Sequence, residues 1–306
     1  MGRLSVFIFV TRGAWYGDLV AQLFTPKTGK EQIMMSRGLV ALLMAVLWQT
    51  TANASHSITQ CGETCTSSDA QCNLGTNLSC GATAVTLSTG ADLDLKGHTI
   101  SCSSCSSATA VVVTDSNTTI EDTGDSVSGA RGGILGEWGT GIDCALKSNS
   151  IARHLLVNGA STGIRNCRKV QGVTVLSPNT GIMNSSIGAS DYIKDSMVVG
   201  ITGGGNHAVY GVQVGGNGAG LIDHNVVANC HGAINTVNAS STSLTVTNNS
   251  LYALADPNVG GVYLVGTAGS VITDGNVCGA PSEDAICEDC VQDGYCQGPT
   301  QPLAVP

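Results

Sequence analysis

Two short polar segments of the chain carry side chains that could do acid–base chemistry, Lys194-Asp195 and Asp223-His224. Both segments stand at the same place in a repeated sequence pattern. On neighbouring parallel strands, equivalent positions lie about 4.8 Å apart. A base, an acid and two carboxylates would therefore converge at one place.

Such a cluster fits two reactions on polysaccharides. A polysaccharide lyase needs a base that removes the proton next to a uronic carboxylate, and Lys194 or His224 could be that base. Asp195 and Asp223 could hold Ca²⁺ against the developing anion. A glycoside hydrolase instead needs two carboxylates at a defined separation, and the same two aspartates could supply them. If the chain is an enzyme, we predict four catalytic residues: Lys194, Asp195, Asp223 and His224.

Three further residues near this cluster could bind a ligand. His231 follows shortly after the second segment, and His207 lies beside the glycine-rich stretch 200–205. Tyr210 offers a ring of the kind that stacks on pyranose faces. We predict His207, His231 and Tyr210 as binding residues.

The same residues also have a structural interpretation. Asp, Asn, His, Ser and Gly have short polar side chains or open backbones that suit tight corners. Asn248 and Asp274 stand in the same column without a partner that would make a site. The predicted corner column consists of Gly97, Asp122, Arg153, Gly172, Asp195, His224, Asn248 and Asp274.

The element that would position these residues is a repeat of about 25 residues. An apolar anchor is followed by a polar turn residue three places on and an apolar residue at five, as at Leu95 and Ile100. The predicted anchors are Leu95, Ile120, Ile151, Val170, Ile193, Ile222, Val246 and Ile272. A period in this range predicts a solenoid, in which stacked units share one core.

The residues between the anchors indicate which solenoid. They are short alternations of Gly, Ser, Thr, Asn and Val without a helix-length amphipathic run, and Gly-Ile or Gly-Val recurs. LDLKGHTI at 93–100 and the IxDxN-type corners resemble the first coil and the repeat of the right-handed parallel β-helix family, the pectate-lyase-like solenoids with PbH1 repeats. The resemblance covers roughly residues 85–280. It implies an all-β fold, a right-handed parallel β-helix of about eight coils over residues 91–278.

The resemblance is specific for fold and weak for function, because this fold carries lyases, hydrolases, epimerases, adhesins and inert stalks. The segment Leu221-Ile-Asp223-His224 resembles the I-D-H element of pectate lyases. The R-x-P-x-x-R motif that carries their catalytic arginine is missing after it. The N-T-D, D-D and G-H-G signatures of polygalacturonases are missing too, and Cys230-His231-Gly232 is only a partial approach.

Residues 1–54 are expected to lie outside the fold. Residues 34–54 combine a basic start, the apolar run 38–48 and Ala52-Asn53-Ala54, which together predict a secretory signal peptide cleaved after Ala54. Residues 1–33 are then an upstream extension from a misplaced start codon. The alternatives are a long leader or an N-terminal membrane anchor. We predict a secreted protein, extracellular or periplasmic, whose mature chain does not insert into a membrane.

The charge of the mature chain excludes some partners. After residue 54, eight Lys and Arg face twenty Asp and Glu, a net charge of −12. Such a surface repels nucleic acid and anionic membranes. We expect a monomer that contacts a polysaccharide or cell-surface glycan, with Ca²⁺ as the one cofactor that the residues suggest.

The thirteen cysteines all follow residue 54 and crowd the two ends of the predicted solenoid. Behind a signal peptide they predict disulfides that close a cap at 55–90 and a tail at 279–306. Zinc bound by Cys102 with Cys105, or by Cys287 with Cys290, has suitable spacing but needs a different compartment. Because thirteen is odd, one thiol stays unpaired, and we predict Cys230. The candidate disulfide cysteines are Cys61, Cys65, Cys72, Cys80, Cys102, Cys105, Cys144, Cys167, Cys278, Cys287, Cys290 and Cys296.

Two hypotheses of function follow. The first is a non-catalytic surface or binding protein that contacts an extracellular or cell-wall polysaccharide. The second is a polysaccharide lyase or glycoside hydrolase. The incomplete catalytic motifs favour the first.

Overall fold

The computed structural model divides into two units, residues 1–52 and 53–306, and only parts of the second are described. The described residues are 55–66, 69, 71–88, 90–124, 132–177, 179–200, 210–215, 220–230, 232–237, 244–253, 262–266, 271–279 and 287–288. Their regular elements are β-strands. Over these ranges the chain has no helix with the length and apolarity for a bilayer crossing.

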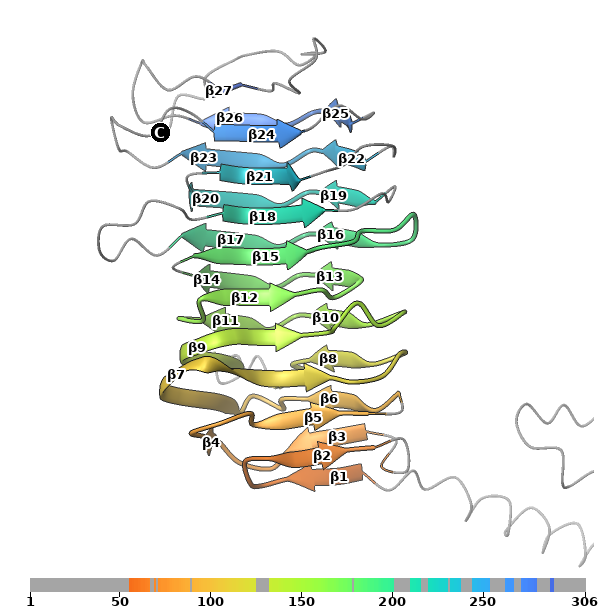
Figure 1. Cartoon of the computed structure of the whole chain (residues 1–306), viewed down its shortest axis with the longest axis vertical. Coiled ribbons are helices and arrows are strands. Elements are labelled where there is room, and N and C mark those ends of the chain that lie inside the picture. Colours follow the sequence, from red (N-terminus) through yellow and green to blue (C-terminus); the bar gives the residue numbers. More distant parts are fainter. Residues whose placement is uncertain are drawn as a thin grey trace, which may run out of the picture. The chain divides into compact units, whose positions relative to one another are not determined.

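The strands form three ladders, and every pairing in them is parallel (Figure 1). The first ladder is β1 (Ser55–Ile58), β3 (Gln71–Leu74), β6 (Asp92–Asp94), β8 (Thr119–Glu121), β10 (Ile151–Arg153), β13 (Lys169–Gln171), β16 (Tyr192–Lys194), β19 (Leu221–Asp223), β22 (Leu244–Thr247) and β25 (Val271–Asp274). Since each strand pairs with its counterpart one turn later, the chain returns to the same position at every turn.

Two long strands, β7 (Thr99–Val113) and β9 (Gly133–Asp143), belong to both remaining ladders. The second ladder also holds β4 (Leu78–Ser79), β11 (Leu156–Asn158), β14 (Thr174–Ser177), β17 (Met197–Gly200), β20 (Val226–Cys230), β23 (Ser250–Ala253) and β26 (Val277–Gly279). The third also holds β2 (Glu63–Cys65), β5 (Val85–Leu87), β12 (Thr162–Arg165), β15 (Thr180–Asn184), β18 (Tyr210–Gly215), β21 (Gly232–Val237), β24 (Val262–Gly266) and β27 (Cys287–Glu288). The prediction of a nearly all-β fold of parallel strands is confirmed, and the arrangement is compatible with a parallel β-helix.

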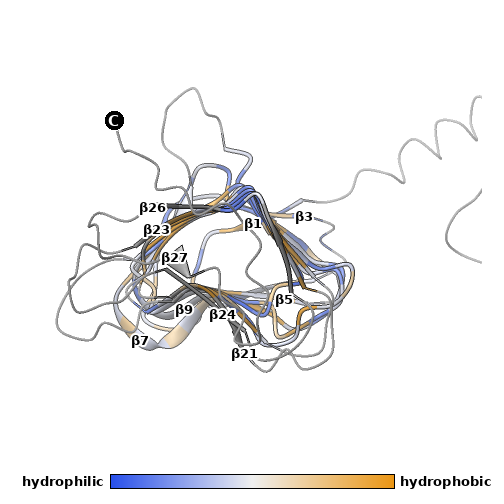
Figure 2. Ribbon diagram, turned by 90° about the horizontal axis from the view of Figure 1, so that it is seen from above, coloured by the Kyte–Doolittle hydropathy of each residue, from blue (hydrophilic) through white to orange (hydrophobic). Residues whose placement is uncertain are grey.

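The core lies between the ladders, which surround a common interior (Figure 2). Alternate residues of each short strand point inward, so one β-branched residue stacks on its counterpart in the next turn. On the third ladder such a column runs through Ile142, Ile164, Ile182, Val212 and Ile234, all at most 1% exposed. Each buried aliphatic side chain contributes roughly 1.5–3 kcal/mol.

The recurrent Gly-Ile pairs have a steric cause. Gly163 precedes the inward Ile164, and a Cβ atom added to Gly163 would lie 2.6 Å from the carbonyl oxygen of Gly181 in the next turn. The same close approach links Gly181 to Gly211. Glycine is required here because only a residue without a side chain lets successive turns come this close.

A ladder of buried amides joins the later turns just after the corner between the first and second ladders. Asn225 and Asn249 are at most 1% exposed. The Asn225 Nδ2 atom donates to the Ile193 carbonyl at 2.9 Å and to Asn249 Oδ1 at 3.0 Å. Asn249 makes the equivalent bonds to the Ile222 carbonyl and to Asn276 Oδ1. Each asparagine side chain therefore satisfies backbone groups of the preceding turn and bonds the asparagine side chain of the following turn.

The LDLKGHTI segment is fixed by a buried carboxylate. Asp94 has no exposed surface. It accepts hydrogen bonds from the backbone N–H groups of Lys96 and Thr123 at 3.0 and 2.9 Å, and from the Thr123 hydroxyl. The Lys96 ammonium lies 2.8 Å from Asp94 Oδ2. This network ties the corner of one turn to the next.

The structure corrects the register of three predicted anchors. Ile120 pairs with Leu93 of the preceding turn, where Leu95 was predicted. It pairs with Ala152 of the following turn, where Ile151 was predicted. Val246 pairs with Thr273 rather than Ile272. Hydrophobicity alone misled the alignment at Ile151, because there the inward residue is the small Ala152 and the larger side chain is partly exposed.

The segment predicted as an N-terminal loop cap, residues 55–90, also differs. It contributes the strands β1–β5, and β1 pairs with β3, which pairs with β6. The first ladder therefore has ten strands within the described residues, where about eight coils were expected. The strands of this segment were not predicted because their alternation of buried and exposed residues involves cysteines and polar residues. In QCNL, for example, the buried residues are Cys72 and Leu74.

Four disulfides stabilise the described part of the chain and indicate an oxidising environment. They are Cys61–Cys80, Cys65–Cys72, Cys102–Cys105 and Cys144–Cys167. The Cys102–Cys105 disulfide excludes the zinc alternative for that pair in this structure. Among the described residues Cys230 is the free cysteine, and it is buried. The side chains of Cys278 and Cys287 are not described, and Cys290 and Cys296 lie outside the described residues.

Candidate functional site

The structure brings the two predicted catalytic segments together. Lys194 ends β16 and pairs in register with Asp223, which ends β19. The next residues, Asp195 and His224, form the corner that leads into the second ladder. The Asp195 N–H donates to the Asp223 carbonyl at 3.2 Å.

The corner requires an unusual backbone. Asp195 and His224 both have φ of 53°, in the left-handed region. Asp, Asn and His enter this region more readily than other residues with side chains. The observed corner column is His154, Gly172, Asp195, His224, Asn248 and Gly275, with φ between 52° and 66°. His154 and Gly275 therefore replace the predicted Arg153 and Asp274, and backbone geometry explains the residue types in this column.

The Asp223 carboxylate is fully engaged. Its Oδ1 atom accepts from the Thr247 hydroxyl at 2.7 Å and from Asn248 Nδ2 at 3.0 Å. Its Oδ2 atom lies 2.6 Å from Nδ1 of His224. Burial acts to raise the pKa of Asp223, but these hydrogen bonds, led by that from Thr247, outweigh it and hold the pKa below its ordinary value. Asp223 is therefore an ionised anchor that orients the exposed imidazole of His224.

Lys194 and Asp195 do not share this network. The Lys194 ammonium lies 4.8 Å from the centroid of the Tyr192 ring, a cation–π contact. Among the described residues it forms no ion pair with Asp223. The Asp195 carboxylate is exposed and accepts from Gln171 Nε2 at 3.2 Å.

The residues do not fit the predicted calcium site. Calcium takes six to eight oxygen ligands, and both oxygens of Asp223 are already occupied by hydrogen-bond donors. Among the described residues Asp195 and Asp223 belong to no cluster of three ligand-type side chains. We therefore derive no step through Ca²⁺.

A shallow open groove of about 580 Å³ runs along the corner column. Its polar lining includes Asp122, His154, Asp195 and His224, which belong to different turns of the chain, together with Thr174 and Ser196. Its apolar lining is Val173, Met197 and Val226, and the last two are the large hydrophobic side chains exposed in the described residues, at 41% and 39%. The groove follows the stacking direction, so a linear ligand lying in it would meet one turn after another.

Two groove residues were not predicted as site residues. His154 stood within a recognised repeat, but the misplaced anchor at Ile151 assigned the corner to Arg153. Arg153 instead donates through Nε to Glu121 at 2.6 Å. Asp122 accepts from the backbone N–H groups of Gly97 and Gly132 at 2.7 and 2.6 Å, so it shapes one end of the groove.

The predicted binding residues are only partly described. His207 and His231 lie outside the described residues. Tyr210 begins β18 and pairs with Thr180 and Gly232, and its side chain is not described. These predictions stay predictions.

Comparison with known proteins gives no relative. No protein-family model matches the chain, and neither a curated protein nor a solved structure does. Function must therefore be inferred from the residues of this chain.

Proposed function

We propose that the chain is a secreted right-handed parallel β-helix protein that binds an extracellular or cell-wall polysaccharide. The observation that carries this proposal is the groove along the corner column. The groove spans several turns, and most of these turns contribute a side chain that can form hydrogen bonds. A linear polymer with hydroxyl groups on every sugar unit needs such a row of partners.

Binding is favoured over catalysis by how the polar groups are used. Both carboxylate oxygens of Asp223 already have hydrogen-bond partners, and Lys194 lies over a tyrosine ring. Neither has the free, poised state that a catalytic base needs. The groove is also open, whereas catalysis benefits from a site that excludes water.

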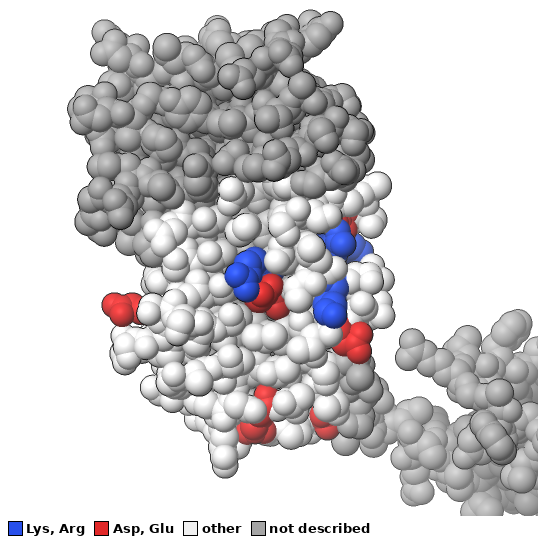
Figure 3. All heavy atoms as spheres, viewed as in Figure 1, with Lys and Arg blue, Asp and Glu red and all other residues white. Residues whose placement is uncertain are grey.

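The charge of the molecule limits the classes of polysaccharide that we expect it to bind. One face carries few charged side chains on a largely neutral surface (Figure 3). The groove lining contains the exposed carboxylate of Asp195 and the buried carboxylate of Asp122, and no lysine or arginine. A neutral polysaccharide suits this lining better than a nucleic acid or another polyanion, which the carboxylates would repel. We propose a monomer, released after cleavage near Ala54.

Affinity electrophoresis of the oxidised chain against a panel of neutral and uronic polysaccharides tests the proposal. The informative variants are Asp195→Asn and His224→Asn, because asparagine tolerates the left-handed backbone and removes only the charge or the ring. Glu137→Ala, at an exposed position outside the groove, is the control. We expect the double variant to weaken binding at least tenfold, about 1.4 kcal/mol, and the control to bind normally. Binding to no polysaccharide, or binding indifferent to both groove substitutions, would exclude this function.

A second candidate, a polysaccharide lyase, is favoured by one observation. The 2.6 Å contact between Asp223 and His224 is the pairing of an orienting carboxylate with a base. If His224 removes the proton next to a uronic carboxylate, the chain will release unsaturated products that absorb in the ultraviolet. Asp223→Asn would then abolish turnover while binding persists. Reducing ends without unsaturation would indicate a hydrolase instead.

A further inference from the structure

One wall of the groove carries an exposed apolar strip. Met197 begins β17 and Val226 begins β20, and the two residues pair in register on neighbouring turns. Thr174 precedes Met197 in this column and Ser250 follows Val226, so the strip is two turns long. Exposed apolar side chains that adjoin one another and are rimmed by polar residues are typical of ligand-binding grooves.

The facing wall is polar and belongs to the corner column. Asp195 and His224 stand in it on neighbouring turns, and both are exposed. Ser196, which lies between Asp195 and Met197 in the chain, is buried and belongs to the floor of the groove. A ligand in this groove therefore meets hydrogen-bonding groups on one side and an apolar surface on the other.

Gly172 brings a third side chain into the polar wall. In the corner column it stands between His154 and Asp195, one turn from each. A Cβ atom added to Gly172 would lie 2.7 Å from Cδ2 and 3.3 Å from Nε2 of His154. The imidazole therefore lies over Gly172, in the space that a side chain there would fill. The ring thus reaches the turn next to Asp195, although its own backbone is two turns away.

We infer, on the premise that the proposed polysaccharide binding holds, that the groove at Gly172 seats a sugar ring whose hydroxyl groups are equatorial. Such a ring has a polar edge and apolar faces, because its axial C–H bonds point to the faces. His154 and Asp195 bond hydroxyl groups along the edge, the carboxylate as acceptor and the imidazole as donor or acceptor. Met197 and Val226 pack against the face.

The apolar strip selects against axial hydroxyl groups. Successive rings of an extended β-1,4-linked chain turn opposite faces to the same side, so the two-turn strip contacts both faces of the repeating unit. In a mannan, every second ring would direct its axial hydroxyl group into Met197 or Val226. A hydroxyl group that is buried there without a partner loses its hydrogen bonds to water. The ligand class is therefore a neutral β-glucan rather than a mannan.

Two corner glycines supply matched variants for affinity electrophoresis on a soluble β-glucan. Gly172→Asn keeps the left-handed backbone, which asparagine tolerates, and displaces the His154 ring. Gly275→Asn makes the same change at a corner that does not line the groove, where the added Cβ would meet the Asn248 amide oxygen at 2.5 Å. We expect Gly172→Asn to weaken binding at least tenfold and Gly275→Asn to bind normally. His154→Asn removes the ring without altering the corner and should match Gly172→Asn.

The double variant Met197→Gln/Val226→Thr tests the apolar wall. Both positions are exposed, so polar side chains of similar size there spare the core. The unsubstituted chain should bind the β-glucan about tenfold more tightly than a soluble β-mannan, and the double variant should lose most of this preference. Ile151→Thr, at a partly exposed position on β10 that does not line the groove, is the control and should keep it.

The outcomes separate this site from the proposed function. Binding to no polysaccharide would exclude both. If Asp195→Asn with His224→Asn weakens binding while His154→Asn and Met197→Gln/Val226→Thr leave it unchanged, the function stands and the sugar-ring site is wrong. Equal or tighter binding of the mannan, or binding confined to charged polysaccharides, would likewise overturn the sugar-ring site alone.

Discussion

Replacement of Asn249 by alanine tests whether the buried amide ladder holds the later turns together. Asn249 has no exposed surface. Its side chain donates to the Ile222 carbonyl at 3.0 Å and to Asn276 Oδ1 at 2.9 Å. Its Oδ1 atom accepts from the backbone N–H of Asn225 at 2.9 Å and from Asn225 Nδ2 at 3.0 Å. The substitution therefore removes four hydrogen bonds at once.

The expected cost follows from the groups left without partners. In Asn249→Ala, the Asn225 N–H and the Ile222 carbonyl lose the amide that satisfies them in the interior. Each buried unsatisfied group costs about 1–3 kcal/mol. We expect the free energy of unfolding to fall by roughly 3–5 kcal/mol, a large share of the 5–15 kcal/mol that holds an ordinary domain.

Urea denaturation followed by circular dichroism measures this change. The control is Asn179→Ala, at an exposed position where Nδ2 donates to the Ser161 hydroxyl, and its effect should stay within about 0.5 kcal/mol. A loss below about 1 kcal/mol in Asn249→Ala would refute the reasoning, because the orphaned groups would then have found water or other partners.

Three further predictions concern charge and sulfur. Burial acts to raise the pKa of Asp94, but hydrogen bonds, led by that from Lys96, hold it below its ordinary value. The stability that Asp94 contributes is therefore fully present above its unfolded pKa of about 3.9 and is lost as the pH falls through the folded pKa. Asp94→Asn should lower the free energy of unfolding by about 2–3 kcal/mol at neutral pH and weaken its fall at acid pH, measured by urea denaturation at a series of pH values. A variant whose stability falls with acid as steeply as that of the unsubstituted chain would contradict this. Removal of the Cys144–Cys167 disulfide, which joins residues 23 apart, should cost about 3 kcal/mol in urea, and a negligible cost would show that the reduced, unfolded chain is already restrained. Burial raises the pKa of Cys230 to about 12, so a thiol reagent should label it only after unfolding, whereas rapid labelling of the native chain would show that the thiol is accessible.

The sequence predicted the candidate site correctly where the hydrophobic residue chosen as the anchor is also the residue that faces the core. Lys194 and Asp223 follow anchors that the structure keeps in register, so their pairing was visible in the sequence. His154 was missed because the core-facing residue of this strand is the small Ala152, so the more hydrophobic Ile151 was taken as the anchor. The anchor was thus placed one residue early, and the corner was assigned to Arg153. The state of Asp223 could not be predicted at all, because its donors Thr247 and Asn248 come from the following turn.

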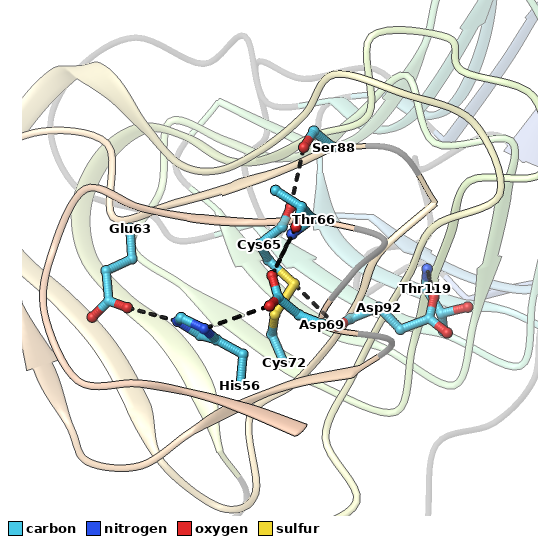
Figure 4. The surroundings of a disulfide bond; sticks show 9 residues. All are labelled: His56, Glu63, Cys65, Thr66, Asp69, Cys72, Ser88, Asp92 and Thr119. Carbon is cyan, nitrogen blue, oxygen red and sulfur yellow. Dashed lines mark hydrogen bonds and ion pairs between the residues drawn. A yellow bond between two sulfur atoms is a disulfide. The ribbon is translucent and has the colours of Figure 1, made fainter. Parts of the chain in front are cut away.

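The sequence by itself determined the repeat, the parallel strands and the residue types at the corners, because each is set by local constraints. An inward apolar position, a left-handed corner and an unsatisfied backbone group each restrict the residue that can stand there. Tertiary structure alone decided which side chains share a groove, which cysteines pair and which turn begins the stack. These depend on the registers between turns and on distances between residues far apart in the chain, as where His56 meets Asp69 beside the Cys65–Cys72 disulfide (Figure 4).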